Sequence, residues 1–259
     1  MGAGLGRLWA KRGHHVMFSF SRQAEKLRDL ARDIGIQARS GTPQDAVRFA
    51  DVVLLAVPWS GIGDALSDAG PLDGKIVISC VNPFGPGGLE LGLTTSAAEE
   101  IAKLAPGAEV VEAFNTIFAS ILHSRTRRPG DSPTVFYCGD NSGAKAKVAG
   151  LIRDAGLHAV DAGPLQNARF IEPLAMLMAE LGHPQRMGSD IAIRLMSNSE
   201  TTELVRMVFV GARNPAAGEL MADNLAADAP YGRYPVRKRG KAPTRIKNFR
   251  CALSRFQRN

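Results

Sequence analysis

Six short apolar runs, rich in β-branched residues, alternate along this chain with segments whose apolar side chains recur at helical spacing. Apolar strands separated by helices are typical of a parallel sheet that helices cover on both faces. The predicted strands are His15–Phe20, Asp51–Val57, Lys75–Cys80, Glu109–Ala113, Thr134–Cys138 and Leu157–Asp161. The predicted helices are Ala3–Arg12, Gln23–Asp33, Ile62–Ser67, Ser96–Leu104, Thr116–His123, Ser142–Asp154 and Ala168–Leu181.

The composition fits a globular α/β protein and excludes several other classes. With 45% hydrophobic and 22% charged residues, the 259-residue chain is neither collagen-like nor wholly disordered. The longest apolar run, Val52–Val57, is far shorter than a membrane span, and no secretory signal pattern opens the chain. The three cysteines are far apart, which favours a reducing cytoplasm and excludes a structural zinc site.

The net charge of +7 belongs to the C-terminal tail and not to the body of the protein. Residues 231–259 hold ten of the 32 Lys and Arg residues and none of the 25 Asp and Glu residues, so the preceding chain carries −3. A run of like charges is typically solvated and disordered. We therefore predict a basic, disordered tail, and we do not expect nucleic acid to be the partner of this protein.

The chain opens with the pattern of the second half of a nucleotide-binding βαβ unit. An apolar helical stripe (Leu5, Leu8, Trp9) stops at Gly13, and a strand follows. No apolar run precedes Gly2, so the predicted doubly wound, Rossmann-type sheet lacks its first strand and the first two glycines of the phosphate-binding turn. We expect a truncated or misassigned gene product with impaired folding or cofactor affinity.

Two further glycines of this region, Gly4 and Gly6, could be read as part of a phosphate-binding fingerprint together with Gly2. We reject that reading because no strand precedes them and the spacing to Arg22 would then be too short. We expect Gly4 and Gly6 on the first helix, where it packs close to the sheet.

Several motifs in a fixed order carry a resemblance to a known family. Over about residues 2–195 the chain resembles NADPH-dependent oxidoreductases related to the F420:NADP oxidoreductases. The stretches that carry the resemblance are Gly2–Arg22, Ala50–Trp59, Leu72–Lys75, Val81–Phe84, Ala113–Thr116, Asp161–Leu165, Ala168–Arg169 and Glu172–Leu174. The resemblance implies that NADP(H) is the cofactor, that a deazaflavin of the F420 type is the hydride acceptor, and that Gly2 is the third glycine of G-x-G-x-x-G.

The residues after the first predicted strand favour NADP over NAD. NAD-binding units place Asp or Glu there, where it accepts hydrogen bonds from the ribose 2′-hydroxyl. This chain has Ser21 and Arg22, with Lys26 one turn into the next helix, and the three groups suit a 2′-phosphate. The alternative is that Arg22 only ends a strand and that Lys26 is a solvated helix residue.

Three other strand ends are predicted to form the wall of one cleft, because ligands bind at the carboxyl ends of strands in such sheets. In the related family the first of them, Val57, Pro58 and Trp59, lies along the nicotinamide. Trp59 is either a stacking partner for a planar ring or a packing residue. Asn82 and Asn115, with Ala113 beside the latter, are candidates for contacts to an amide or a substrate. Alternatively, both asparagines only form turns.

The sequence offers no convincing catalytic acid–base set and no metal-ligand cluster. Hydride transfer between two bound rings needs alignment more than proton transfer, so this is consistent with the family resemblance. The predicted function is NADP-dependent hydride transfer to or from a deazaflavin coenzyme. The alternatives are another acceptor (a flavin, a metal centre or a small carbonyl or imine) and a non-catalytic nucleotide-binding remnant.

The predicted organisation has two parts. Residues 1–195 form the NADP-binding domain, and residues 196–259 form an extension that is partly helical and then basic and disordered. The helix at residues 168–181 is rich in Met and Leu, which is typical of a core helix or of a dimer interface. We expect a homodimer through this helix.

Overall fold

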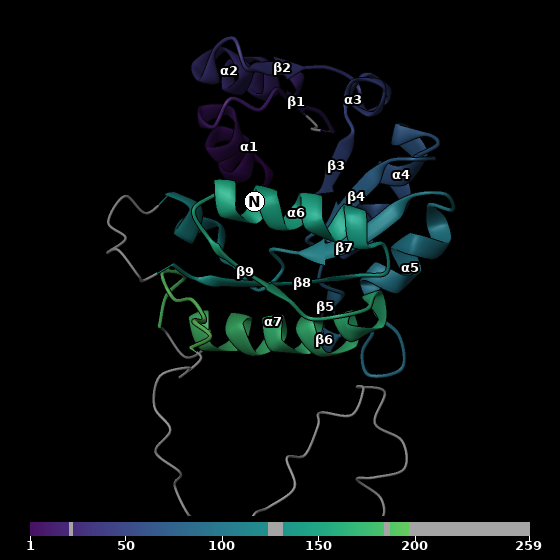
Figure 1. Cartoon of the computed structure of the whole chain (residues 1–259), viewed down its shortest axis with the longest axis vertical. Helices are drawn as coiled ribbons and strands as arrows, with labels where there is room; N and C mark the ends of the chain where they lie inside the picture. The colour runs from purple at the N-terminus through teal and green to yellow at the C-terminus, as the bar shows by residue number, and fades with distance from the viewer. Residues whose placement is uncertain (21–22, 124–131, 184–186, 197–259) are drawn as a thin grey trace, which may run out of the picture. The chain divides into compact units, whose positions relative to one another are not determined.

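The main sheet has five strands and lies at the centre of the fold (Figure 1). The computed structural model describes residues 1–20, 23–123, 132–183 and 187–196. The strands of the main sheet lie in the order β3 (Val52–Leu55), β4 (Ile76–Ser79), β7 (Glu109–Ala113), β8 (Thr134–Gly139) and β9 (His158–Asp161). All neighbours in this sheet are parallel except β7 and β8, which are antiparallel.

Two short strands stand apart from the main sheet. β1 (Val16–Phe18) and β2 (Ala38–Ser40) pair in parallel as a sheet of their own, with Val16 opposite Ala38. Within the described residues, β1 has β2 as its strand neighbour and β3 has β4. The predicted Rossmann-type α/β fold, with helices around a mostly parallel sheet, is therefore confirmed.

Helices cover both faces of the main sheet. One apolar cluster joins α1 and α6 to the sheet through residues such as Leu5, Val111 and Ile152, which are fully buried. The other cluster joins α4 and α5 to the opposite face through Ile62, Val77 and Ile101. The helices are α1 (Gly2–Lys11), α2 (Ala24–Ile34), α3 (Pro43–Phe49), α4 (Ile62–Ala69), α5 (Ala97–Leu104), α6 (Ser142–Asp154) and α7 (Ala168–Gly182).

The structure departs from the predicted elements at a few places. The helix predicted at residues 116–123 is a short 3₁₀ segment, η2 (Ala119–His123), and β8 reverses direction relative to β7. Three features were not predicted: β2, α3 and the small hairpin of β5 (Phe84–Gly85) and β6 (Gly88–Leu89). Two more 3₁₀ segments, η1 (Trp59–Gly61) and η3 (Leu165–Asn167), precede α4 and α7.

Two sequence predictions fall on residues beyond this description. The basic tail and nearly all of the extension at residues 196–259 lie outside the described residues, as do Ser21 and Arg22. In the described part of the chain, no helix is both long and apolar enough to cross a membrane.

Candidate cofactor-binding cleft

The carboxyl ends of β1, β2 and β3 surround a cavity of about 1060 Å³, which we call the cofactor cleft. Phe20 follows β1, Ser40 ends β2, and Ala56 follows β3. Because parallel strands end at the same edge of a sheet, this cleft lies where ligands bind in open α/β folds. The cleft is lined by Phe20, Ala24, Leu27, Arg28, Ser40–Pro43, Asp45, Ala56–Pro58, Ser60, Gly61, Asp64 and Asp68.

A complete helix cap fixes one wall of the cleft. Thr42 is the N-cap of α3, and its hydroxyl accepts a hydrogen bond from the Asp45 backbone N–H at 3.1 Å. The Asp45 carboxylate in turn accepts from the Thr42 N–H at 3.2 Å, and Pro43 occupies the first helical position. The Thr42 hydroxyl also donates to the Asp45 carboxylate at 2.7 Å. This bond, followed by the bond from the Thr42 N–H and by the nearby Arg48 guanidinium, holds the pKa of Asp45 below its usual range.

The predicted cofactor residues take different positions in the structure. Val57 and Pro58 line the cofactor cleft, whereas Gly2 begins α1 and lines a second cavity, of about 840 Å³, between β1 and β3. Trp59 opens η1 and packs half-buried against the cluster on the α4 side. Lys26 is exposed on α2 and is not among the lining residues of either cavity.

The two predicted asparagines form a reciprocal pair at the ends of β4 and β7. The side-chain amide of Asn82 donates to the backbone oxygen of Asn115 at 3.0 Å, and the Asn115 amide donates to Oδ1 of Asn82 at 3.0 Å. The pair ties two neighbouring strand ends together, which neither predicted role required. Both residues, with Ala113, lie outside the lining of the two cavities.

The backbone just before Asn115 is strained. Phe114 is fully buried and has a φ of 65°, which is rare for a residue with a side chain. Its ring meets the Trp9 ring edge-on, with centroids 6.0 Å apart. Beyond it, Oδ1 of Asn115 and Oγ1 of Thr116 are buried without a hydrogen-bond partner among the described residues. Unsatisfied acceptors at a strand end are suited to a polar group of a bound ligand.

Arg28 is a candidate that the sequence analysis missed. It lies on α2, lines the cofactor cleft and pairs with Glu25 one turn earlier. The signal was available, because Arg28 lies two residues after Lys26 on the same predicted helix. Asp64 and Asp68 line the same cleft from α4, so its charge is mixed.

The two described cysteines are poor nucleophiles. The thiol of Cys80 donates to the Leu55 oxygen at 3.2 Å, and burial followed by the charge of Glu112 raises its pKa to about 12. Cys138 has no exposed surface and does not line the cleft, and burial also raises its pKa. Thiolates are the reactive form, so both residues act as packing groups here. No cluster of three or more His, Cys, Asp or Glu side chains in the described ranges could hold a metal ion.

Two buried carboxyl groups were also missed as a pair. Glu112 lies on β7 and Glu172 on α7, and both have no exposed surface. Glu172 accepts hydrogen bonds from the first backbone N–H groups of α5, at Ala97 (3.0 Å) and Ala98 (3.1 Å). Burial raises the pKa of Glu172 to about 7, and burial together with the charge of Glu172 raises that of Glu112 well above its usual range.

The fold and the cleft define a class. A doubly wound sheet with a roomy cleft at its strand ends is the architecture of Rossmann-type, dinucleotide-dependent oxidoreductases. The residues present are compatible with such a cofactor, because strand ends, a capped helix and an arginine converge on one cavity.

Comparisons with known proteins place the chain within this class. The family described as "NADP oxidoreductase coenzyme F420-dependent" matches residues 1–83. The F420-dependent NADP reductase of Methanothermobacter thermautotrophicus is 30% identical over 203 residues, which is 72% of this chain and 86% of that protein. The chain belongs to the family of F420-dependent NADP reductases. Its members are NADP-dependent oxidoreductases, and NADP is the cofactor that this membership assigns.

Two further relatives agree with this assignment. A solved structure assigned as an F420-dependent NADP reductase from Arthrobacter sp. FB24 superposes with a TM-score of 0.67 at 26% identity and covers 76% of this chain and 94% of that one. Metalloreductase STEAP3 of Rattus norvegicus is 35% identical over 136 residues, or 52% of this chain. The chain spans only 27% of that rat protein.

Proposed function

We propose that this protein transfers hydride between NADP(H) and a deazaflavin coenzyme of the F420 type. The observation that carries the proposal is the relation to an F420-dependent NADP reductase over most of both chains. Bound NADP(H) would supply or accept the hydride, the deazaflavin would be its partner, and a solvent proton would balance the exchange. Such chemistry needs two rings held at contact distance, which is the task of a cleft more than of an acid–base pair.

In this proposal, the residues of this chain position the cofactor and the acceptor. Val57 and Pro58 bound the cofactor cleft at the end of β3, where Pro58 lacks a backbone N–H that would otherwise need a partner. Asn115 offers Oδ1, and Thr116 offers Oγ1, for the nicotinamide carboxamide or for the acceptor. Gly2 and Trp59 complete the proposed cofactor contacts, together with Asn82 and Ala113.

The direct test of the proposal follows the deazaflavin absorbance with NADPH present. Loss of the oxidised deazaflavin band, with one NADPH consumed for each coenzyme reduced, is the expected result. A spectroscopic titration with NADPH comes first, because a remnant without cofactor binding would show no saturable change. If NADPH binds and the deazaflavin stays oxidised, the proposed acceptor is wrong.

A second acceptor has one specific observation in its favour. The match to a metalloreductase covers half of this chain at 35% identity, so ferric chelate reduction is the alternative. It is measured with the same enzyme and NADPH by trapping ferrous ion with a colorimetric chelator, with and without added flavin. Turnover of ferric chelate in the absence of deazaflavin would favour this alternative.

The preference for NADP is proposed to rest on Ser21, Arg22 and Lys26. Replacing Arg22→Ala is expected to raise the KM for NADPH about 10–100-fold and to leave that for NADH nearly unchanged, because a charge-assisted contact to the 2′-phosphate is lost. Arg32→Ala is the matched control, since Arg32 is an exposed residue of α2 that pairs with Asp29. Equal effects on both cofactors would contradict the proposed role.

A homodimer through α7 and a cytoplasmic location complete the proposal. Phe170 (65% exposed) and Leu177 (54% exposed) leave apolar surface on α7, whereas Ile171 and Met178 face the core. Light scattering is expected to give a dimer that Phe170→Glu converts to a monomer. A wild-type monomer would remove this part of the proposal.

A further inference from the structure

Arg28 supplies the one positive charge among the described residues that line the cofactor cleft. The other charged side chains of that lining are the carboxylates of Asp45, Asp64 and Asp68. NADP(H) carries a pyrophosphate and a 2′-phosphate, and carboxylates alone would repel both groups. The guanidinium of Arg28 is therefore the described group of this cleft that is best suited to attract an anionic cofactor.

The turn of α2 determines which of its basic residues faces the cleft. Ala24, Leu27 and Arg28 line it, and residues three and four apart share one face of a helix. Lys26 lies two residues before Arg28, which is about 200° around the helix, and it is exposed outside the lining of both cavities. The face of α2 that borders the cleft thus carries Arg28 and not Lys26.

The guanidinium of Arg28 already has a neighbour that can be displaced. Its Nη2 donates to Oε1 of Glu25, one turn earlier. This ion pair is open to solvent, because 55% of the Arg28 side chain and 79% of the Glu25 side chain are exposed, and exposed pairs contribute little. A phosphate dianion carries more charge than a carboxylate and bonds the fork of an arginine with two oxygens, so it competes well with Glu25.

The place of α2 in the fold distinguishes between the phosphates of the cofactor. In Rossmann-type units the pyrophosphate lies at the N-terminus of the first helix, and the ribose of the adenosine lies at the end of the strand after that helix. Here these elements are α1 and β1, and α1 contributes no residue to the cofactor cleft. Phe20, just after β1, lines the cleft together with Arg28. Arg28 therefore lies on the ribose side, where the 2′-phosphate distinguishes NADP from NAD.

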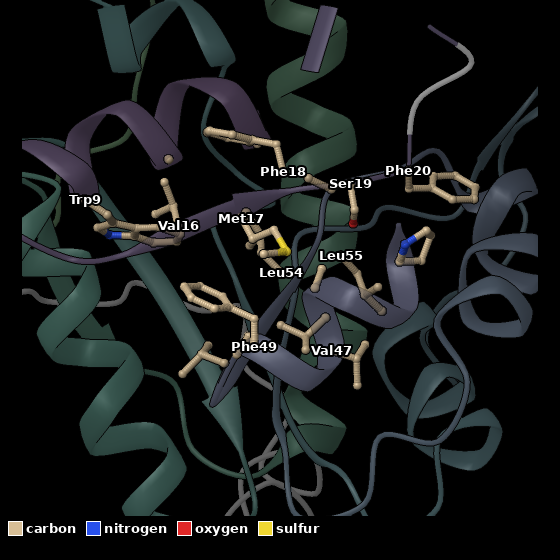
Figure 2. A pocket seen from close by; sticks show the side chains of 18 of the residues that line it. Trp9, Val16, Met17, Phe18, Ser19, Phe20, Val47, Phe49, Leu54 and Leu55 are labelled. Carbon is tan, nitrogen blue, oxygen red and sulfur yellow. The ribbon is translucent and has the colours of Figure 1, made fainter. Parts of the chain in front are cut away.

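The cavity between β1 and β3 is less suited to a phosphate. Figure 2 shows that aliphatic and aromatic side chains dominate its walls, among them Met17, Phe18 and Leu54. The one lysine or arginine among its described lining residues is Lys147 on α6, and α6 contributes no residue to the cofactor cleft. A phosphate is costly to bury among apolar groups, so the cofactor cleft is the cavity suited to the charged part of the cofactor.

We propose that Arg28 is a specificity-determining residue that binds the 2′-phosphate of NADP(H), and that Glu25 competes with this phosphate for the guanidinium. The proposal rests on the proposed function, since it requires that NADP(H) binds in the cofactor cleft. It adds Arg28 to Ser21, Arg22 and Lys26, and it assigns Arg28 a larger contribution than Lys26. It is separate from the identity of the acceptor, because the 2′-phosphate takes no part in hydride transfer.

The test measures the binding of two nucleotides to the full chain by calorimetry. The nucleotides are 2′,5′-ADP and 5′-AMP, which differ only in the 2′-phosphate. Arg28→Ala is expected to weaken the binding of 2′,5′-ADP about 10–100-fold and to change that of 5′-AMP less than about twofold, because a charge-assisted contact is lost. Arg28→Lys should restore only part of the affinity, since an ammonium group cannot bond two phosphate oxygens as a fork. Lys26→Ala should cause a smaller loss than Arg28→Ala.

Glu25→Gln is expected to change the affinity in the opposite direction. The variant removes the competing carboxylate and keeps the size of the side chain, so 2′,5′-ADP should bind about two- to fivefold more tightly. If the Glu25–Arg28 pair only stabilised α2, this variant would not bind the nucleotide more tightly. Asp29→Asn is the matched control, because Asp29 is an exposed residue of α2 that pairs with Arg32. It makes the same change of charge and should leave both affinities within about twofold.

Four outcomes would overturn the proposal. They are unchanged binding of 2′,5′-ADP in Arg28→Ala, equal weakening of both nucleotides in that variant, a larger loss in Lys26→Ala, and no tighter binding in Glu25→Gln. A titration of the wild-type chain with NADPH separates this proposal from the proposed function. If NADPH binds and one of the four outcomes occurs, only the assignment of Arg28 and Glu25 is wrong. If neither NADPH nor 2′,5′-ADP binds, both proposals fail.

Discussion

The two sheets of this protein differ in how their strands are buried. In the main sheet, β4 and β7 have neighbours on both sides, and Val77, Ile78 and Val111 have no exposed surface. In the β1–β2 pair, every residue of β1 is only half-buried, although α1 packs directly beside it. A covering helix therefore does not by itself bury a strand. Burial of a strand also requires neighbouring strands on both of its sides. In the described part of the chain, β1 has one such neighbour, whereas β7 has two.

A valine-to-alanine substitution in each of the two sheets tests this contrast, and it should give the largest difference in the free energy of unfolding. Val111→Ala in β7 is expected to lower the free energy of unfolding by about 2–4 kcal/mol, because it leaves a cavity in a close-packed core. Val16→Ala in β1 should cost about 1 kcal/mol or less, since its surroundings are partly open. Urea unfolding of both variants measures the difference. Equal costs would mean that β1 is packed as firmly as β7.

The stability of the two regions should depend on pH in opposite directions. This effect should be smaller than that of the valine substitutions. Burial raises the pKa of Glu112 in the main sheet, so its contribution to stability is complete below about 4.5, the ordinary pKa of Glu, and is lost as the pH rises through the raised value. Glu172, with a pKa of about 7, behaves in the same direction. Asp45, beside β1 and β2, has a lowered pKa and loses its contribution as the pH falls.

Replacing Glu112→Gln should therefore remove part of the loss of stability that begins above about pH 4.5, on the order of 1–2 kcal/mol at the alkaline end. The matched control is Glu109→Gln, an exposed residue of the same strand, which should leave the slope unchanged. Unfolding midpoints across this pH range measure both variants. A Glu112→Gln variant with the slope of the wild type would show that the carboxyl is not held neutral.

The fold was predictable where apolar periodicity was strong. All six predicted strands exist, and helices such as Ser142–Asp154 match the structure residue for residue. β2 was missed because its three residues, two half-buried and one exposed, carry too little pattern, whereas α3 was missed despite a clear cap signal in Thr42, Pro43 and Asp45. The reversal of β8 depends on a chain connection that no local residue pattern encodes.

The candidate site was less predictable than the fold. Strand ends are visible in a sequence, and Val57 and Pro58 do line the cleft. The bond pattern between Asn82 and Asn115 is not visible, because it depends on two strands that are brought side by side only in three dimensions. The expected place of Gly6 on a helix against a strand is confirmed, since a Cβ there would meet the Phe18 ring at 2.5 Å. Gly4 also lies on α1, but it packs against Leu122 of η2 rather than against a strand.

The smallest expected effect concerns two glycines inside helices of the two regions. Gly150→Ala in α6, where a Cβ would meet nothing within 4 Å, should stabilise the protein by about 0.5–1 kcal/mol through helix propensity. Gly6→Ala gains the same propensity but must displace the Phe18 ring, so we expect a net loss of about 1 kcal/mol or less. The loss is small because β1 has a neighbour on one side only and can shift. Urea unfolding midpoints of the two variants measure this, and a loss above about 3 kcal/mol for Gly6→Ala would mean that the β1–β2 pair is as rigid as the main sheet.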